Sequence, residues 1–374
     1  MAAPRPSRGP SPRPGILEIA PYKGGDASLP GVTRVIKLAS NEGPFGPSPK
    51  AMAAFSETAA KLHLYPDGGS VQLRKAIAGV YGLEADRIVC GTGSDELLAL
   101  LARAYAGPGD EVILSEHEFL MYRIAALSAG ATPVEVPMVD LCCSVDNILG
   151  AVSANTRIVF LANPNNPIGT FVPKAELARL AAGLPEDCLL VIDSAYAEYV
   201  ERDDYEPGVA LVNQYPNVIM TRTFSKIYAL GGLRIGWGYG SPEVIDVLDR
   251  IRGVFNVTLP GQAAAQAAVE DIEFVERCRD HNRTCRAWFA EALRAFGLTV
   301  PPSEGNFVLV RFPDGQAQAA AADETLRKAG IIVRVMKSYG FEDALRISIG
   351  PEEDMTLCRD VLATFMGNFM GKSA

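Results

Sequence analysis

Short apolar runs alternate with helical patterns through the middle of the chain. The runs are rich in valine and isoleucine and bounded by turn residues, which is typical of buried strands. They are RIVC (87–90), DEVILS (110–115), TPVEVP (132–137), TRIVFL (156–161), CLLVID (188–193) and NVIMT (217–221). Apolar residues recur at helical spacing in residues 94–107, 119–130 and 173–183. This alternation predicts an α/β fold in which a mostly parallel sheet is covered on both faces.

The pattern changes after residue 255. A long helical stretch comes first, and after it shorter apolar runs alternate with two further helical patterns. These segments are about 262–296, 306–312, 317–329, 331–335, 344–350 and the C-terminal end. We therefore predict a large domain over residues 41–255 and a smaller α+β domain over 256–374. Residues 1–15, with five prolines and three arginines, are predicted to be a flexible tail, and 16–40 an arm packing with the small domain or a neighbouring subunit.

Composition and charge exclude several classes of protein. The net charge of −9 disfavours a broad nucleic-acid surface, and no apolar run approaches the ~18 residues that span a bilayer. The N-terminal segment has no apolar core, so it does not resemble a secretory signal. The seven cysteines are odd in number and form no C-x-x-C pair, and the three histidines are scattered. We expect a cytoplasmic protein with reduced thiols and without a metal site.

The segment VCGTGSDELL at 89–98 has the pattern of a strand, a glycine turn and a helix start. Backbone N–H groups at a helix start are unpaired and suit an anion. Ser94 is also a good N-cap, so a plain strand-to-helix connection explains the motif as well. Because Glu96 stands where a third glycine would be, the motif is not a dinucleotide-binding fingerprint. It is a candidate anion site.

Polar residues also follow two of the predicted strands. In LANPNNPIGT (161–170), prolines and a glycine constrain the backbone, and asparagines lie at the strand's C-terminal end, where open α/β sheets bind ligands. Asp193 ends a fully apolar strand, and Tyr196 comes three residues later. A buried carboxylate is costly unless it is paired or hydrogen-bonded. The partner of Asp193 is therefore either a helix cap or a ligand cation.

A lysine stands in the hydroxyl-rich turn of TRTFSKIYALGGLRIGW (221–237). Asp193, Asn163 and Lys226 each follow an apolar strand of one sheet, so their side chains can converge at its C-terminal edge. Groups suited to a phosphate lie beside the lysine, namely Thr223, Ser225 and Arg234. An anion cradle, a buried acid and a lysine on one edge predict a site for pyridoxal phosphate.

From about residue 16 to the end, the chain resembles the fold-type I pyridoxal-phosphate aminotransferases, and among them the histidinol-phosphate aminotransferase family. The motifs that carry the resemblance are APYKGG, LASNEGPFGPSP, LYPDGGS, GTGSDELL, NPNNPIGT, VIDSAYAEY, TRTFSKIYALGGLRIGW and LRISIG. The resemblance implies a fold-type I transferase fold and pyridoxal 5′-phosphate as cofactor. It also implies a homodimer whose two subunits share their active sites.

Within the family, each matched residue has an expected role. Lys226 matches the lysine that binds the cofactor covalently and moves a proton as general base and acid. Asp193 matches the partner of the pyridinium nitrogen, and Asn163 and Tyr196 match the groups that hydrogen-bond the ring hydroxyl. Phe119 falls where the family usually stacks a tyrosine on the ring, so the stacking is kept and the hydroxyl lost.

The remaining matches concern the phosphate and the substrate. The residues expected to bind the cofactor phosphate are Ser94, Asp95, Thr223, Ser225 and Arg234, together with Tyr65 from the neighbouring subunit. Arg346 matches the arginine that binds a substrate carboxylate, and Asn41 matches a substrate-binding position. Arg334 and Tyr22 match positions that recognise the distal group of the substrate.

Three segments depart from the family pattern. Gly43 stands where the family often has asparagine, Ser194 replaces the usual glutamate of DEAY, and PYKGGD differs from the commoner PYVPGK. We place these departures near the substrate side, so they weaken the assignment of the substrate more than that of the reaction.

The resemblance implies a ping-pong aminotransferase that takes histidinol phosphate as amino donor and 2-oxoglutarate as acceptor, in histidine biosynthesis. Three alternatives stay open at this point. The first is the same chemistry with aromatic amino acids as donors, and the second is a decarboxylase of threonine phosphate. The third is a non-catalytic pyridoxal-phosphate-binding module. Retention of Lys226, Asp193 and Arg346 favours an enzyme over such a module.

Overall fold

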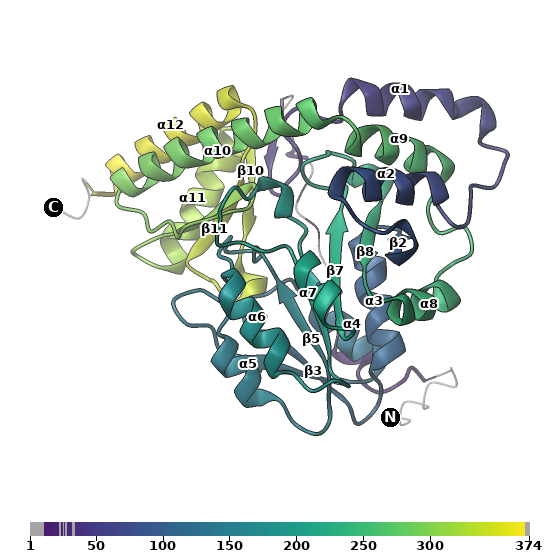
Figure 1. Ribbon diagram of the computed structural model, residues 1–374. Coiled ribbons are helices and arrows are strands. Elements are labelled where there is room, and N and C mark those ends of the chain that lie inside the picture. The colour runs from purple at the N-terminus through teal and green to yellow at the C-terminus, as the bar shows by residue number, and fades with distance from the viewer. Residues whose placement is uncertain (1–10, 22–23, 25, 27, 32–33, 371–374) are drawn as a thin grey trace, which may run out of the picture.

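The computed structural model describes residues 11–21, 24, 26, 28–31 and 34–370. Two β-sheets organise this part of the chain (Figure 1). The larger sheet has seven strands in the order β2-β8-β7-β6-β5-β3-β4. Their bounds are β2 (Ile88–Gly91), β3 (Glu111–Ser115), β4 (Thr132–Val136), β5 (Thr156–Ala162), β6 (Leu189–Asp193), β7 (Val218–Thr223) and β8 (Gly236–Tyr239). Of these seven described strands, only β8 runs in the direction opposite to the other six, so the predicted α/β fold with a mostly parallel sheet is confirmed.

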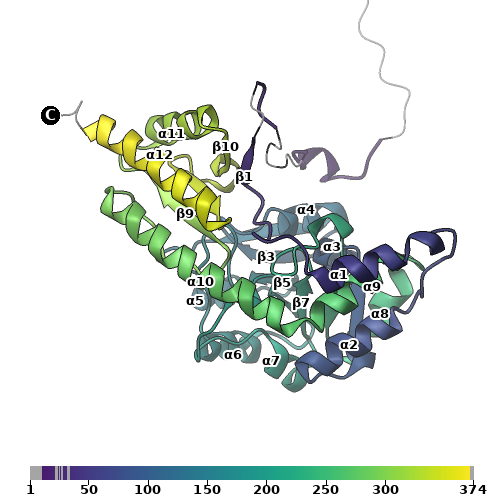
Figure 2. The ribbon, with the colours of Figure 1, turned by 90° about the horizontal axis from the view of Figure 1, so that it is seen from above.

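Helices cover both faces of this sheet because its strands bury side chains on both sides. Phe160 packs in a cluster with α3 (Ser94–Tyr105), α4 (Met121–Ala129) and α8 (Pro242–Ile251). Leu161, the next residue, faces the opposite cluster. That cluster holds residues of α1 (Pro49–Glu57), α2 (Val71–Tyr81), α5 (Val145–Ala151), α6 (Lys174–Gly183), α7 (Val209–Gln214) and α9 (Leu259–Val269). Figure 2 shows α3 and α4 on one side of the strands and α6 and α7 on the other.

The smaller sheet has the order β1-β10-β11-β9. Its strands are β1 (Ile36–Leu38), β9 (Phe307–Arg311), β10 (Ile331–Val335) and β11 (Ala344–Ser348), and the helices α10 (Ile272–Ala295), α11 (Gln316–Lys328) and α12 (Glu352–Met370) pack on it. Short 3₁₀ turns complete the described elements: η1 (Ile16–Glu18), η2 (Ala59–Lys61), η3 (Ala85–Arg87), η4 (Ala197–Tyr199), η5 (Gly231–Leu233) and η6 (Lys337–Tyr339). β1 runs parallel to β10, so a segment from the N-terminal part of the chain forms one edge of a sheet built otherwise from C-terminal residues.

The transition between the two cores lies inside α10. Val275 and Cys278, in its first half, belong to the core of the larger sheet, whereas Phe289 and Leu293 belong to that of the smaller sheet. Figure 2 shows α10 crossing from the neighbourhood of α9 toward α12. The long helical stretch predicted for residues 262–296 is therefore two helices, α9 and α10. The domain division at residue 255 stays a proposal.

Local sequence explains where several helices begin. Ser48, Ser241 and Thr258 each place a side-chain oxygen on the N–H three residues later, and a proline follows in the first turn of α1, α8 and α9. Within the described ranges, no helix combines the length and the apolar character needed to span a membrane.

Candidate active site

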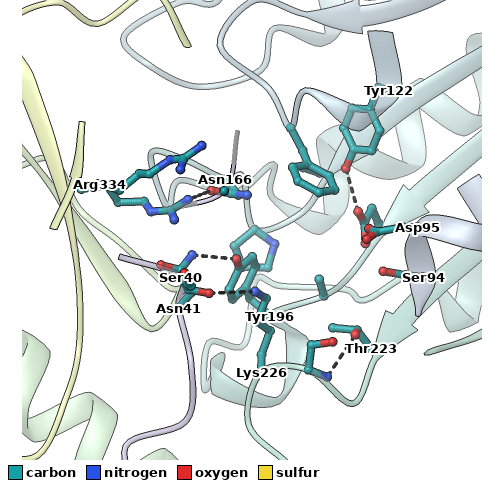
Figure 3. Close-up of a pocket in the computed structure, with 18 of the residues that line it drawn as sticks. Ser40, Asn41, Ser94, Asp95, Tyr122, Asn166, Tyr196, Thr223, Lys226 and Arg334 are labelled. Atoms are coloured by element: carbon teal, nitrogen blue, oxygen red, sulfur yellow. Dashed lines mark hydrogen bonds between the residues drawn. The ribbon is translucent and has the colours of Figure 1, made fainter. Parts of the chain in front are cut away.

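A cavity of about 290 Å³ lies between the C-terminal ends of the larger sheet's strands and the smaller sheet (Figure 3). Most of the predicted site residues line it: Asn41, Ser94, Asp95, Phe119, Asp193, Tyr196, Thr223, Ser225, Lys226, Arg234, Arg334 and Arg346. They come from segments that are far apart in the sequence. The convergence follows from the topology, because β2, β3, β5, β6 and β7 all end at this edge of the sheet.

Asp193 ends β6 and is 5% exposed. Both of its carboxylate oxygens accept hydroxyl hydrogen bonds, Oδ2 from Tyr122 at 2.8 Å and Oδ1 from Thr221 at 3.3 Å. Burial raises the pKa of Asp193 to about 6, and the two hydroxyl hydrogen bonds oppose that rise. The carboxylate is therefore held in one orientation in an environment where a ligand cation would be a favourable partner.

Lys226 follows β7 in a tight turn. The turn is closed by backbone hydrogen bonds from Ala229 to Lys226 and from Leu230 to Phe224, at 2.9 and 3.0 Å. Nζ of Lys226 donates to the carbonyl of Ser40 at 3.4 Å and lies 5.7 Å from the ring centroid of Tyr196. The amine is thus aimed into the cavity and half-buried.

An anion cradle forms where α3 begins. Gly93 is the N-cap of α3, with φ 78°, and Ser94 is the first residue of the helix. The sequence-based prediction that Ser94 caps this helix is therefore wrong. Arg234 lies across this start, with Nη2 3.2 Å from Asp95 Oδ2 and Nη1 3.2 Å from Ser225 Oγ. A Cβ at Gly93 would lie 2.5 Å from Nη2 of Arg234, so glycine is needed for this approach. Backbone N–H groups, a hydroxyl and a guanidinium therefore surround one small space.

Tyr196 and Asn41 form the wall next to Lys226. The Tyr196 hydroxyl accepts a hydrogen bond from Asn41 Nδ2 at 2.9 Å. Asn41 has φ 57° and is fixed by Ser348, which accepts from its backbone N–H at 2.8 Å and donates to its Oδ1 at 2.9 Å. Burial raises the pKa of Tyr196 to about 12, so this hydroxyl stays protonated at neutral pH.

Two arginines face the cavity from the smaller sheet. Arg334 in β10 and Arg346 in β11 are register partners on adjacent antiparallel strands, so their side chains leave the same face of the sheet. Arg346 is 6% exposed and donates to Asn166 Oδ1 and, at 3.0 Å, to the carbonyl of Ala39. Figure 3 shows Arg334 on the same side of the cavity as Asn166.

The structure corrects the choice of asparagine. Asn163 does not line the cavity; its side chain exchanges two hydrogen bonds with the backbone of Val172, at 2.8 and 3.3 Å. Asn166 lines the cavity instead. The physical reason is that the backbone of Asn163 still pairs with β6, because its N–H donates to the Asp193 carbonyl at 2.9 Å. Its side chain is occupied by the backbone of Val172.

Other predicted positions lie outside the cavity. Tyr65 is 81% exposed and stacks on Phe255, with ring centroids 4.6 Å apart. Ser194 is fully buried, and its hydroxyl donates to the carbonyl of Pro207 at 2.6 Å. Contrary to the prediction that it lies on the substrate side, Ser194 does not line the cavity. The prediction for Tyr22 falls outside the described residues.

Several polar residues of the cavity lining are not among the residues predicted from the sequence, namely Ser40, Tyr122, Asn166 and Tyr339. Asn166 lies inside the NPNNPIGT motif, and pattern alone does not separate it from Asn163. Tyr122 lies in an apolar helical pattern, where a tyrosine gives no signal of its hydroxyl's partner. Within the described residues, no group of three or more histidine, cysteine, aspartate or glutamate side chains is arranged to hold a metal ion.

These residues fit pyridoxal phosphate. The cradle at the start of α3 suits a phosphate, the buried carboxylate of Asp193 suits a protonated ring nitrogen, and Phe119 adds an aromatic ring to the same cavity lining. Lys226 is an amine in the same cavity that can bond to an aldehyde. The donor set thus matches each polar group of this cofactor.

Comparison with known proteins agrees with this geometry. The family model of class I and II aminotransferases matches residues 33–362. The histidinol-phosphate aminotransferase of Paramagnetospirillum magneticum is 56% identical over 359 residues, which is 96% of this chain and 99% of that protein. The one of Rhodospirillum centenum is 54% identical over 358 residues, 96% of this chain and 99% of that protein.

Among solved structures, histidinol-phosphate aminotransferase from Sinorhizobium meliloti, in complex with pyridoxal-5′-phosphate, superposes with a TM-score of 0.84 at 30% identity. The match covers 90% of this chain and 92% of that one. The fold, the cavity and these likenesses have one explanation. The chain belongs to the class I and II aminotransferases, which are pyridoxal-phosphate enzymes, and within them to the histidinol-phosphate aminotransferase family.

Proposed function

We propose that this enzyme transfers the amino group of L-histidinol phosphate to 2-oxoglutarate, and that it also runs in reverse. The observation that carries the donor assignment is the pairing of Arg334 with Arg346 on one face of the smaller sheet. Two guanidinium groups in one cavity suit donors and acceptors that carry anionic groups. The names of relatives that are 50–56% identical support the same substrate.

In this proposal the cofactor would be held from several sides. Asp193 would accept a hydrogen bond from the protonated ring nitrogen, Phe119 would pack on the ring, and Tyr196 with Asn166 would bind the ring hydroxyl. The phosphate is bound by Ser94 and Asp95 at the start of α3 and by Thr223, Ser225 and Arg234. When bound, pyridoxal phosphate supplies an electron-accepting ring that stabilises negative charge at the donor's Cα.

Lys226 has two tasks in the proposed reaction. It binds the cofactor through its amine between turnovers, and it then carries the proton that leaves Cα of the donor. Its Nζ lies next to the Tyr196 ring and the Ser40 carbonyl, which confine the amine to one side of the cavity. That confinement favours removal of the proton from one face of the donor.

The arginines divide the recognition of substrates. Arg346, fixed by Asn166 and the Ala39 carbonyl, grips the α-carboxylate of glutamate. Arg334 is half-buried and also borders a second cavity, which is lined in part by Ala20, Pro21 and Gly24, so it is placed to reach a distal anion. Histidinol phosphate brings a phosphate and glutamate a second carboxylate, and one guanidinium can bind either.

We also propose a homodimer with shared active sites and a cytoplasmic location. Large apolar side chains are exposed on segments that flank the helices of the larger sheet: Leu62 (65%), Leu64 (55%), Tyr65 (81%), Val254 (71%) and Phe255 (45%). A patch of this kind is typical of a surface that a second protein covers. In the dimer, Tyr65 would reach the cofactor phosphate of the other copy.

A panel of amino donors against 2-oxoglutarate tests the proposed substrate. Histidinol phosphate, phenylalanine, tyrosine and threonine phosphate are compared by kcat/KM, with release of carbon dioxide followed in parallel. We expect histidinol phosphate to be the best donor. A higher kcat/KM for phenylalanine would show that the donor is an aromatic amino acid. Release of carbon dioxide from threonine phosphate would show that the enzyme is a decarboxylase.

The Arg334→Ala variant tests the role of the distal arginine in the same assay. Loss of a charged hydrogen-bond partner should cost about 2–4 kcal/mol in transition-state binding for glutamate and histidinol phosphate. Phenylalanine has no distal charge, so its single-turnover rate should change far less. Equal losses for phenylalanine and glutamate would exclude a distal-anion role for Arg334.

A further inference from the structure

Tyr122, in the first turn of α4, is fully buried and touches two groups of the proposed site at once. Its ring stacks on Phe160 of β5, with centroids 5.0 Å apart and planes at 7°. Its edge meets Phe119, with centroids 5.8 Å apart and planes at 89°. Packing on both sides fixes the direction of the phenol group.

The Tyr122 hydroxyl is the closer of the two hydroxyl partners of the Asp193 side chain. It donates to Oδ2 at 2.8 Å, and Figure 3 shows this bond at the cavity. The second hydroxyl, from Thr221 to Oδ1, is longer at 3.3 Å. A donated hydrogen bond is stronger when the accepting carboxylate is ionised, so this bond restricts the rotation of Asp193 and favours its ionised form.

We propose that Tyr122 is a positioning residue of the transamination reaction, which aligns the carboxylate of Asp193 with the cofactor's ring nitrogen and keeps that carboxylate ionised. Through the same ring it supports Phe119, which packs on the cofactor. The proposal rests on the roles proposed above for Asp193 and Phe119. Tyr122 itself does not exchange protons with the substrate.

The electrostatic surroundings show why such a donor is needed. Burial raises the pKa of Asp193 and so favours its protonated form. Other charged or titratable groups face it from each neighbouring element: Asp95 on α3, Glu118 before α4, Tyr196 after β6 and Lys226 after β7. The two carboxylates, Asp95 and Glu118, oppose the negative charge on Asp193. A hydroxyl that donates to the ionised carboxylate works against both effects.

Loss of the hydroxyl should therefore make Asp193 more basic. A more basic carboxylate takes the proton from the ring nitrogen more readily, and the ring is then a weaker electron acceptor. The replacement Tyr122→Phe keeps the stacking on Phe160 and the edge contact with Phe119, so it removes the hydrogen bond with little change in packing.

The first test uses the full-length protein freed of cofactor. Carbon-13 NMR of protein labelled at the aspartate carboxyl carbons follows the titration of Asp193, and Asp193→Asn assigns the resonance. In Tyr122→Phe the midpoint should rise by roughly one pH unit, which corresponds to one hydrogen bond to a charged group. Thr221→Val should move it in the same direction by less, and it tests the same network if Tyr122→Phe does not fold.

The second test uses the cofactor-loaded protein. In Tyr122→Phe, the pH dependence of the cofactor's absorption band should shift, and kcat should fall about tenfold with a smaller change in KM. Tyr239→Phe is the matched control, because Tyr239, in β8, is also a buried tyrosine and donates to Asn213 Oδ1 at 3.0 Å, away from the cavity. It should change neither the absorption profile nor kcat.

An unchanged Asp193 midpoint in cofactor-free Tyr122→Phe overturns the proposal. A raised midpoint with an unchanged absorption profile also overturns it, provided that Asp193→Asn does alter that profile. If Asp193→Asn leaves the absorption profile unchanged, the role proposed for Asp193 fails instead. Equal losses in Tyr122→Phe and Tyr239→Phe would reduce Tyr122 to an ordinary packing residue.

Discussion

Gly43 and Ala229 fit each other across the Lys226 turn. A Cβ at position 43 would lie 2.7 Å from Cβ of Ala229 and 3.2 Å from the carbonyl oxygen of Lys226. Ala229 has φ 54°, which is unfavourable for a residue with a side chain. A side chain at position 43 would therefore have to displace Ala229 or the Lys226 turn.

A double-mutant cycle tests this pairing. Gly43→Ala should lower the free energy of unfolding by about 1–3 kcal/mol, because the added methyl overpacks the turn. Ala229→Gly should remove both the contact and the backbone strain, so the double variant should recover most of the loss. Denaturant unfolding of the cofactor-free protein measures each value.

The control for this cycle is Gly79→Ala, at a helix position with open space around its Cβ. This replacement should not be destabilising, because alanine is the better helix former. If Gly43→Ala costs as much in the Ala229→Gly background as in the wild type, the pairing is contradicted.

At the residue scale, strand ends are the informative part of the sequence. Lys226 and Asp193 stand directly at or after apolar strands, so the placement of both in the cavity follows from the pattern. Asn163 and Asn166 lie in one constrained loop, and which side chain turns inward depends on the contact of Asn163 with Val172. A contact between residues that meet only after folding leaves no trace in a local pattern.

The turn between β3 and α4 is tied to its surroundings by several polar side chains. Glu118 is 3% exposed; Oε2 accepts from the Ser115 N–H and Oε1 from the Ala162 N–H, both at 3.0 Å. The Cys143 thiol also donates to Oε1, at 3.4 Å. The preceding His117 places Nδ1 2.6 Å from the Tyr339 carbonyl. This turn therefore joins β3, β5 and η6 directly before Phe119 enters the cavity.

Glu118 should make the cofactor-free protein sensitive to pH. Burial raises its pKa from 4.5 to about 7, so the folded state holds the proton that the unfolded state loses above pH 4.5. The contribution of Glu118 to the free energy of unfolding is therefore fully present below about pH 4.5. It is lost as the pH rises toward 7, which lowers the free energy of unfolding by up to roughly 3 kcal/mol. Glu118→Gln should flatten this part of the stability curve when unfolding is measured by denaturant between about pH 4 and 8.

The neighbouring glutamate gives the control for that experiment. Glu116 belongs to the same turn and accepts from the Met138 N–H at 2.9 Å, but its side chain is 40% exposed. Glu116→Gln should keep the slope of the wild-type curve. Parallel curves for Glu118→Gln and wild type would show that Glu118 stays ionised in the folded protein.

At the element scale, the periodic helices and the apolar strands β2 to β7 are predicted well, whereas β8 and β1 are not. The helical patterns at 94–107 and 173–183 correspond closely to α3 and α6. β8 reads GWGY, whose glycines give no strand signal, and it is a strand because β2 and β7 pair with it on both sides. β1 has three residues, and only its pairing with β10 makes it recognisable.

At the scale of the whole molecule, several large apolar side chains of the described part are exposed to solvent. Tyr65 and Phe255 stack on each other with most of the Tyr65 ring exposed, and an apolar cavity of about 220 Å³ opens between Met52, Phe55 and Leu233. We expect the surface around Tyr65 to be the dimer interface, as proposed above. The sequence predicts the dimer only through its resemblance to a family, because a single chain's pattern does not distinguish an interface from an exposed loop.

Mixing two inactive variants tests the shared site. Lys226→Ala and Tyr65→Ala are each expected to be inactive or strongly impaired as homodimers. After subunit exchange, one of the two sites in a hybrid dimer regains both residues, so activity should return to about a quarter of wild type in a statistical mixture of equal parts. Sedimentation of the same samples confirms the dimer. A fully active monomer, or no recovery despite proven exchange, contradicts a shared site.

The pairing of β1 with β10 also has a consequence for the order of assembly during synthesis. Ile36 pairs with Ile331, and Asn41, a few residues after β1, contributes to the cavity wall. A ribosome releases residue 331 long after residue 41, so the N-terminal strand must wait for its partner through most of translation. The core of the larger sheet can form in the meantime, because its strands all lie between residues 88 and 239. We therefore expect the nascent chain to acquire its lysine, acid and anion cradle early and to close the substrate side of the cavity last, which keeps an unfinished chain from becoming a working catalyst.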